Sequence, residues 1–360
     1  MYIIGFDIGG ANTKAALLEC KGNKIISARS VIEYFPFWQK TSKDIIKMLN
    51  RLVNRLTSNS PITQEEINLF AITITAELSD AFYTKREGIF IILEALKEVF
   101  GTERLKFMTT NNQFVDFFLA KKEYLAISAA NWVGTALFVG NFIPNCILID
   151  GGSTTIDIIP IVNSLPNTKG KDDTTRLINH ELIYTGALRA TIPSITHFVP
   201  YQGNQVRISF EKFALVSDVH RILNNITEEE YINDTADQRS TSLEDCYARL
   251  ARMICSDLDL ISKKELIRIA EYIYQKQIDL ISSEIKLLMN DLVKRLPNFE
   301  NNPQFIITGL SSDFLIKKAL DSLNYKNIVD FKQVTGIPDN ISSSAYAVAG
   351  ALYFNHLNEF

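Results

Sequence analysis

The sequence lacks an excess of basic residues. Its 360 residues include 37 Lys and Arg against 41 Asp and Glu, which gives a formal net charge of -4 at pH 7. The two signs are mixed along the chain, so no basic stripe supplies the electrostatic footprint of a nucleic-acid-binding surface. We therefore expect no nucleic-acid partner.

The sequence also lacks a long uninterrupted apolar run. The stretch 136–149 is broken by Gly140, Asn141, Pro144 and Asn145, whereas a helix that crosses a bilayer needs roughly 20 consecutive apolar residues. The first residues show neither a basic leader nor a cleavage site. These absences predict a cytoplasmic protein without a membrane segment.

Cysteine and histidine are scarce and poorly spaced for a tight metal site. Each occurs four times, without a Cys-x-x-Cys, His-x-His or His-Glu-x-x-His pair. Because thiolate and imidazole are the usual ligands of structural zinc, the sequence argues against a zinc site.

Hydrophobic patterning predicts strands and helices that alternate around two cores. The hydrophobic content of 46% and the charged content of 22% suit a globular chain long enough for two lobes. The expected strands are 2–7, 13–19, 24–31, 69–75, 146–150, 155–161 and 304–308. The expected helices are 42–56, 243–257, 263–296, 311–320 and 342–354, with a surface loop at 165–173. The alternation predicts an α/β fold.

A turn with two glycines follows the first strand, directly after Asp7. Glycine lets an anion approach backbone N–H groups closely, and aspartate can hold Mg²⁺ through water. The residues that we expect to bind phosphate here are Gly9, Gly10, Asn12, Thr13 and Lys14.

A second turn of the same kind follows Asp150. Its expected phosphate-binding residues are Gly151, Gly152, Ser153, Thr154 and Thr155, and the expected metal ligands are Asp7, Asp150 and Asp157. The two segments align on an aspartate followed by glycines, which indicates an internal duplication. We predict a first lobe at 1–145, a second at 146–341, and a helix at 342–360 that packs back toward the first.

Either turn alone is more often simple hairpin chemistry, but the pair is a stronger signal. A third element, Ile306-Ile-Thr-Gly-Leu-Ser-Ser, places Gly309 and Ser311 between a strand and a helix start. That arrangement offers N–H groups to an anion or a nucleoside. An ordinary strand-to-helix turn is the alternative.

Three such elements in this order resemble the phosphate and adenosine motifs of the actin, hexokinase and heat-shock-protein superfamily. The resemblance implies a two-lobed, actin-like fold with a cleft between the lobes. Within the superfamily, the chain is similar to the hydantoinase and oxoprolinase-like branch, and to its archaeal and methylotroph members linked to tetrahydromethanopterin. The segments that carry this similarity begin at Asp7, Ile72, Ala130, Ile149, Glu181 and Asp234.

The resemblance implies a transferase of methanofuran biosynthesis. The furfuryl carbon of 5-(aminomethyl)furan-3-ylmethyl diphosphate passes to the phenol oxygen of gamma-glutamyltyramine, which forms an aryl ether and releases diphosphate. Mg²⁺ is the expected cofactor, and ATP is not required. These small molecules are the expected partners, and a homo-oligomer is left open.

Acidic and aromatic residues near the turns are candidates for the chemistry. Glu77 and Asp80 follow the strand 69–75, where either could accept the phenolic proton or contact a second metal ion; capping of the next helix is an equal alternative. The expected catalytic residues are thus Asp7, Glu77, Asp80 and Asp150. The expected substrate-binding residues are Asn131, Trp132, Tyr184, Arg189, Asp234, Asp237 and Arg239. A tryptophan near small residues is more often part of a core, and for the last five residues structural roles are equally open.

Two other classes of function compete with the transferase. An ATP-dependent kinase or a hydantoinase-like amide hydrolase would use the same phosphate turns for ATP. A nucleotide-switched chaperone or filament former is the third choice.

Overall fold

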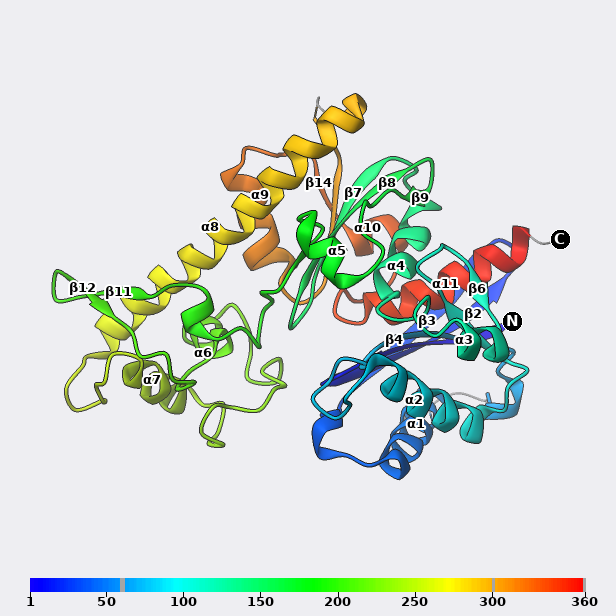
Figure 1. Cartoon of the computed structure of the whole chain (residues 1–360), viewed down its shortest axis with the longest axis horizontal. Helices are drawn as coiled ribbons and strands as arrows, with labels where there is room; N and C mark the ends of the chain where they lie inside the picture. Colours follow the sequence, from blue (N-terminus) through cyan, green and yellow to red (C-terminus); the bar gives the residue numbers. More distant parts are fainter. Residues whose placement is uncertain (59–61, 300–301, 359–360) are drawn as a thin grey trace.

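Two mixed β-sheets organise the chain, for which a computed structural model describes residues 1–58, 62–299 and 302–358. The first sheet has the order β3-β2-β1-β4-β5-β6. Its strands are β1 (Tyr2–Gly9), β2 (Asn12–Lys21), β3 (Lys24–Tyr34), β4 (Leu69–Thr75), β5 (Leu105–Met108) and β6 (Phe114–Val115). One face of this sheet packs in a hydrophobic core with α1 (Ser42–Thr57), α2 (Lys85–Phe100) and α3 (Phe117–Lys122) (Figure 1).

The second sheet has the order β10-β8-β7-β13-β14, with β9 paired to β8. Its strands are β7 (Cys146–Gly151), β8 (Ile156–Val162), β9 (Leu165–Pro166), β10 (Leu182–Ile183), β13 (Phe305–Thr308) and β14 (Ile328–Asp330). A second core joins its outer face to the C-terminal half of α8 (Lys263–Arg295) and to α9 (Lys317–Ser322).

The two sheets repeat one topology, which confirms the predicted duplication. In each, the first strand forms an antiparallel hairpin with the second, and it pairs on its other side with a parallel strand that has a further parallel neighbour. The repeated units are β2-β1-β4-β5 and β8-β7-β13-β14. Each unit therefore places its hairpin turn at the same end of its sheet.

Helices α4 (Asn131–Gly140) and α11 (Ser343–Asn358) lie between the sheets, in a core that also takes side chains from both (Figure 1). Helix α11 approaches β1 very closely because Gly5 has no side chain; a Cβ there would lie 2.0 Å from the Ala345 carbonyl oxygen. A Cβ at Gly350 would likewise lie 2.2 Å from the Phe138 ring. Small residues thus hold the two sheets at a fixed distance. The predicted division of the chain into segments 1–145, 146–341 and 342–360 stays a prediction.

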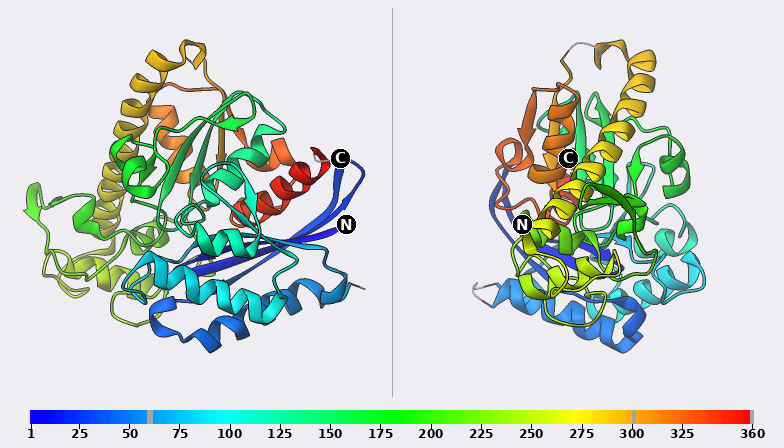
Figure 2. Two further views of the ribbon diagram at one scale, coloured as in Figure 1. Left: turned by 45° about the vertical axis from the view of Figure 1, so that its right-hand side comes forward. Right: turned by 90° about the vertical axis from the view of Figure 1, so that its left-hand side faces the viewer.

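A further layer extends from the second sheet around the N-terminal half of α8 (Figure 2). It contains β11 (Phe198–Tyr201), β12 (Asn204–Arg207), α6 (Val216–Ile222) and α7 (Leu243–Arg252). The remaining elements are α5 (Asp173–Ile178), α10 (Phe331–Thr335), the π-turn η5 (Ser312–Ile316) and the 3-10 turns η1 (Phe37–Gln39), η2 (Gln64–Glu66), η3 (Ile192–Ser194) and η4 (Pro297–Phe299).

Three predicted elements differ from the structure. Helix α7 ends at Arg252 rather than 257, because Cys255 adopts a positive φ of 56° and the Ser256 amide bonds back to the Ala251 carbonyl, which closes the helix. The predicted loop 165–173 begins with β9, and the predicted helix 311–320 begins as the π-turn η5.

None of the helices within the described ranges combines the length and the apolar character needed to cross a bilayer.

Candidate functional site

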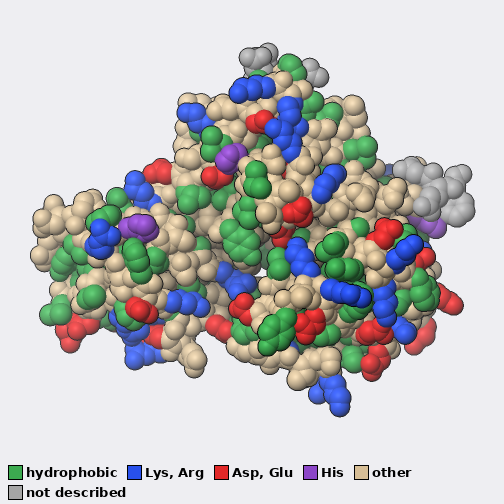
Figure 3. Space-filling model, in the orientation of Figure 1, with side chains coloured by type: hydrophobic (Ala, Val, Ile, Leu, Met, Phe, Trp, Pro, Cys, Tyr) green, Lys and Arg blue, Asp and Glu red, His purple; other side chains and the backbone are tan. Residues whose placement is uncertain are grey.

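A cavity of about 390 Å³ lies between the two sheets. Its wall comes from both hairpin turns, the segment after β4, residues near α5 and β10, and the start of α11. The volume is in the range of small-molecule sites. The surface is also notched between the layer that carries α6 and α7 and the lobe that carries α1 and α2 (Figure 3).

The first turn presents free amides to this cavity. Gly10 and Ala11 form the tip between β1 and β2, and their carbonyl oxygens accept hydrogen bonds from the amides of Phe37 (3.1 Å) and Phe35 (2.8 Å). The amides of Gly10 and Ala11 have no acceptor among the described residues. The tip is therefore anchored through its carbonyls, and its N–H groups are left for a ligand.

The second turn is built in the same way. The carbonyl oxygens of Gly152 and Ser153 accept from the amides of Ala187 (3.0 Å) and Leu188 (2.9 Å). No acceptor for the amides of Ser153 and Thr154 is found within the described part of the chain. Both turns thus bring unpaired donors to one cavity, as the sequence predicted for an anion site.

Asp7, at the end of β1, is held by side chains from three different elements. Ser344 Oγ donates to its Oδ2 at 2.6 Å, Thr73 Oγ1 lies 3.4 Å from its Oδ1, and Lys14 Nζ lies 4.0 Å from its Oδ2. Ser344, at the start of α11, was missed by the sequence analysis. The run of three serines at 342–344 before a small-residue helix was the available signal.

Asp150, at the end of β7, faces the same cavity without a hydrogen bond from any described residue. Burial raises the pKa of its carboxyl group to about 7; the charges of Asp157 and Asp7 act in the same direction, and Lys14 opposes them. A cation or a ligand proton would relieve this repulsion.

The predicted metal ligands fit Mg²⁺ only in part. No group of three or more His, Cys, Asp or Glu side chains in the described ranges is arranged to hold a metal. Asp157 is occupied by an ion pair with Arg176 at 2.6 Å. Asp7 and Asp150 remain available, which suits an ion that keeps several waters and takes one or two carboxylates plus phosphate oxygens.

Glu77 and Asp80 both line the cavity, in different environments. Glu77 is only 1% exposed, and its Oε1 accepts from Ser128 Oγ at 2.6 Å with Lys85 Nζ at 3.7 Å. Its Oε2 has no partner, and burial raises its pKa. Asp80 is exposed. Glu77 therefore has the environment of a proton acceptor.

Four side chains of the cavity wall carry a buried polar atom without a partner in the described structure. These atoms are Asn12 Oδ1, Glu77 Oε2, Ser79 Oγ and Arg176 Nε. Because buried polar groups are nearly always hydrogen-bonded in folded proteins, such a concentration indicates bound water or ligand.

Four predicted phosphate-binding residues do not line the cavity. Gly151, Gly309 and Ser311 instead hold the second and third turns together, since the Ser311 amide donates to the Gly151 carbonyl at 2.9 Å. A Cβ at Gly309 would lie 2.3 Å from that carbonyl oxygen, and one at Gly151 would lie 2.2 Å from Ser311 Oγ. The Thr13 side chain is fully buried in the sheet.

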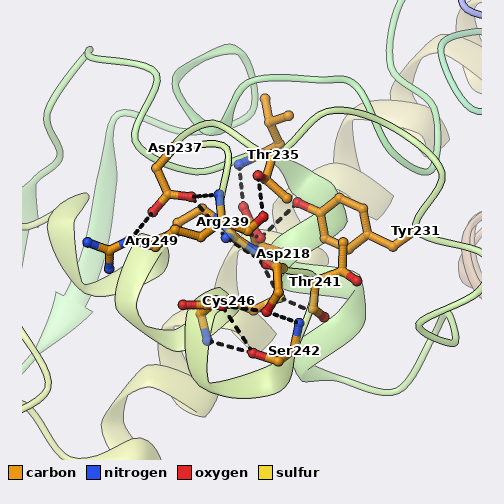
Figure 4. A network of polar contacts seen from close by, with 12 residues as sticks. Asp218, Tyr231, Thr235, Asp237, Arg239, Thr241, Ser242, Cys246 and Arg249 are labelled. Carbon is orange, nitrogen blue, oxygen red and sulfur yellow. Dashed lines mark hydrogen bonds and ion pairs between the residues drawn. The ribbon is translucent and has the colours of Figure 1, made fainter.

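Four predicted substrate-binding residues also lie outside the wall. Trp132 is a core residue of α4, with the Arg176 guanidinium 4.4 Å from its ring centroid. Asp237 forms ion pairs with Arg249 (3.1 Å) and Arg252 (2.8 Å), and Arg239 belongs to the same network (Figure 4).

The fourth is Asp234, which reaches across to the first lobe. Its Oδ2 accepts from Gln39 Nε2 at 3.3 Å, and a hydrogen bond with Tyr34 contributes to a pKa of that phenol of about 12, although burial is the larger cause. The charges of Asp234, Asp237 and Arg239 thus serve contacts within the protein. Residue type alone does not distinguish this role from ligand binding.

Asn131, Tyr184 and Arg189 do line the cavity. The guanidinium of Arg189 lies 5.2 Å from the ring centroid of Trp38, which also faces the cavity and was missed by the sequence analysis. Tyr184 is 64% exposed. Aromatic surface and a cation therefore meet at one side of the cavity.

Comparisons with known proteins agree with this fold and show the family. The family model for hydantoinase/oxoprolinase matches residues 69–355. A (4-{4-[2-(gamma-L-glutamylamino)ethyl]phenoxymethyl}furan-2-yl)methanamine synthase from Methanocaldococcus jannaschii is 36% identical over 98% of both chains. A protein of the same name from Methanococcus vannielii is 35% identical over 61% of this chain and 95% of its own length. A nucleotide-free acetone carboxylase structure shares the fold, with a TM-score of 0.53 and 10% identity over 96% of this chain and 70% of its own.

Gly152 and Gly151 give a matched pair of variants. A Cβ at Gly152 would meet only the Thr155 carbonyl oxygen, at an ordinary 3.5 Å, and would add a methyl group to the cavity wall. We expect Gly152→Ala to keep the melting temperature and to weaken binding of Mg²⁺-diphosphate about tenfold or more by calorimetry. Gly151→Ala should lower the melting temperature. Unchanged binding by Gly152→Ala would contradict the site.

The raised pKa of Asp150 predicts a pH dependence of stability. Its ordinary value is 3.8 and its folded value is about 7, so between these values the folded protein binds more protons at this residue than the unfolded chain does. Its contribution to stability therefore falls as pH rises through that window. The melting temperature of the ligand-free wild type should fall, relative to Asp150→Asn, as pH rises from 5 to 8. Parallel curves would show that Asp150 titrates normally.

Proposed function

The chain belongs to the hydantoinase/oxoprolinase family, and from this premise we propose that it is a transferase of methanofuran biosynthesis. In the proposed reaction, the furfuryl carbon of 5-(aminomethyl)furan-3-ylmethyl diphosphate is attacked by the phenol oxygen of gamma-glutamyltyramine. A carbon–oxygen bond to diphosphate breaks, an aryl ether forms, and the phenolic proton is released. The product is the compound in the name of the relative from Methanocaldococcus jannaschii.

One observation carries the proposal: two acidic turns with unpaired amides share one cavity. Gly10 and Ala11 on one side, and Ser153 and Thr154 on the other, offer N–H donors to the oxygens of a departing diphosphate. Donors aimed where charge develops stabilise a transition state more than a ground state. Lys14 adds a positive charge beside Asp7.

The third turn supports a diphosphate rather than a nucleotide. In related folds a nucleoside would sit against this element, but Gly309 and Ser311 do not line the cavity, and the Ser311 amide is already bonded to Gly151. The cavity wall therefore contains residues of both phosphate turns but not Gly309 or Ser311 of the predicted adenosine element. This is the feature that ranks the transferase above an ATP-dependent kinase or amide hydrolase.

Asp7 and Asp150 are the residues that would hold Mg²⁺. When bound, the ion would neutralise charge on the leaving diphosphate. Ser344 fixes the orientation of the Asp7 carboxylate through its short hydrogen bond. Asp150 has no such anchor among the described residues.

We assign the acceptance of the phenolic proton to Glu77. A phenol has a reference pKa of about 10, and a carboxylate with a raised pKa is better matched to it than an ordinary one. Glu77 lines the cavity, Ser128 holds its Oε1, and its Oε2 has no hydrogen-bond partner among the described residues. Trp38 and Tyr184 give the aromatic acceptor a surface to lie against.

The direct test is to incubate the purified protein with Mg²⁺, the furan diphosphate and gamma-glutamyltyramine. Mass spectrometry should detect the ether, and a coupled assay should detect an equal amount of diphosphate, without nucleotide. No ether, together with acceptor-dependent formation of ADP from ATP, would overturn the proposal in favour of the ATP-dependent enzyme.

Removal of either acidic turn residue should reduce turnover with the fold intact. We expect Asp7→Asn and Asp150→Asn each to lower kcat/KM about 100-fold or more, because each loses charge that offsets the diphosphate through Mg²⁺. Asp259→Asn, a change at an exposed aspartate, is the matched control. Wild-type rates in both site variants would remove these residues from the chemistry.

Glu77 and Asp80 can be separated by the same assay. Glu77→Gln should lower kcat about 100-fold or more, since general bases contribute on that scale, and should leave KM for the diphosphate nearly unchanged. Asp80→Asn should change kcat less than about threefold. The opposite order would assign the proton to Asp80.

A further inference from the structure

The cavity wall carries more acidic than basic side chains. It contains six carboxylates against the three cations Lys14, Arg176 and Arg189. A diphosphate brings further negative charge, and like charges in a partly buried space repel strongly. Mg²⁺ bound at Asp7 and Asp150 would neutralise charge in only one part of the cavity. In the part near Glu77 and α5, Lys85 is the nearby cation, 3.7 Å from Glu77.

Asp173 is a second carboxylate in this part of the cavity wall. It is the first residue of α5, but the capping is done by Asp172, whose Oδ1 accepts from the Thr175 amide at 3.1 Å. The Asp173 side chain is half-buried in the cavity wall and has no hydrogen bond or ion pair with any described residue. Burial raises its pKa; the nearby charge of Lys85 opposes the rise, as does that of Arg176, and the charge of Asp157 adds to it.

The cations near Asp173 are engaged elsewhere. Arg176, one turn along α5, donates to Asp157 at 2.6 Å and to the Glu181 carbonyl at 2.9 Å. Lys85 donates to Ser128 at 3.1 Å and lies 3.7 Å from Glu77. Neither donates a hydrogen bond to Asp173, so the protein itself leaves this carboxylate for another donor.

An independent observation points to a ligand in the same part of the cavity. Glu77 is only 1% exposed, yet its Oε2 has no partner among the described residues. The charges of Glu77 and Asp173 are close enough to affect one another, since Asp173 contributes to the raised pKa of Glu77. A cation at Asp173 would remove that repulsion and keep Glu77 ionised, the state that accepts a proton.

We propose that Asp173 binds a primary ammonium group of a substrate. The inference rests on the proposed function, which supplies two such groups: the aminomethyl group of the furan and the α-amino group of the glutamyl moiety. An ammonium has three donors, which suits a carboxylate with free acceptors, and a hydrogen bond between two charged groups is among the strong ones. Asp173 would thus make the enzyme select a substrate that carries a primary amine.

The test compares Asp173→Asn with the wild type on substrates with and without each amine. One donor analogue carries a methyl group in place of the aminomethyl group, and one acceptor analogue carries a glutaryl group in place of glutamyl. We expect the wild type to prefer one amine-bearing substrate about 10- to 100-fold in kcat/KM, and Asp173→Asn to lose that preference. The analogue that exposes the preference identifies which amine is bound.

Two results separate this inference from the proposed function. If the wild type and Asp173→Asn make the ether and discriminate equally against both analogues, the ammonium subsite is overturned while the transferase stands. If no ether forms, calorimetry with furfurylamine and with gamma-glutamyltyramine still tests the subsite: binding lost in Asp173→Asn supports it, and equal binding overturns it. Asp259→Asn is again the control, and equal melting temperatures establish that the fold is kept.

Discussion

The close approach of helix α11 to strand β1 is the constraint on which the site depends. It is possible only because Gly5 has no side chain where the Ala345 carbonyl lies. The contact brings Ser344, at the start of α11, within 2.6 Å of Asp7. It also joins the first sheet to the core that contains α4 and part of the second sheet. Two turns from distant parts of the chain therefore meet at one cavity.

Both turns are anchored through their carbonyl oxygens, but by different neighbouring residues. Each must be rigid, yet must leave its N–H groups unpaired. The first is held through carbonyls that accept from Phe35 and Phe37, and the second through carbonyls that accept from residues 187–188. Glycine has two separate uses in the second turn, because Gly151 packs against Ser311 whereas Gly152 borders open space. Preorganised donors of this kind favour an anion whose charge grows during the reaction.

Local patterns in the sequence predicted β1–β4, β7, β8 and β13, both turns, the duplication, and Asp7 and Asp150 at the strand ends, because each depends on residues that are neighbours in the chain. The short strands β5, β6, β9–β12 and β14 were not predicted. Trp38 and Asp173 could not be found this way, since only the tertiary fold brings them to the turns, and the serine run at 342–344 does not by itself point to Asp7. Helix α4 is apolar on all sides and so has no helical period to detect. For Asp237 and Arg239 the sequence left structural and ligand-binding roles open, because an ion-pair network and a ligand site use the same charged residues; the structure places both in such a network.

A crystal structure with Mg²⁺ and inorganic diphosphate would test the central claim most directly. The account predicts one diphosphate between the turns, with its oxygens within about 3 Å of the amides of Gly10 or Ala11 and of Ser153 or Thr154, and with the ion on the side of Asp7 and Asp150. A diphosphate bound to one turn alone, or at Gly309 and Ser311, would contradict it.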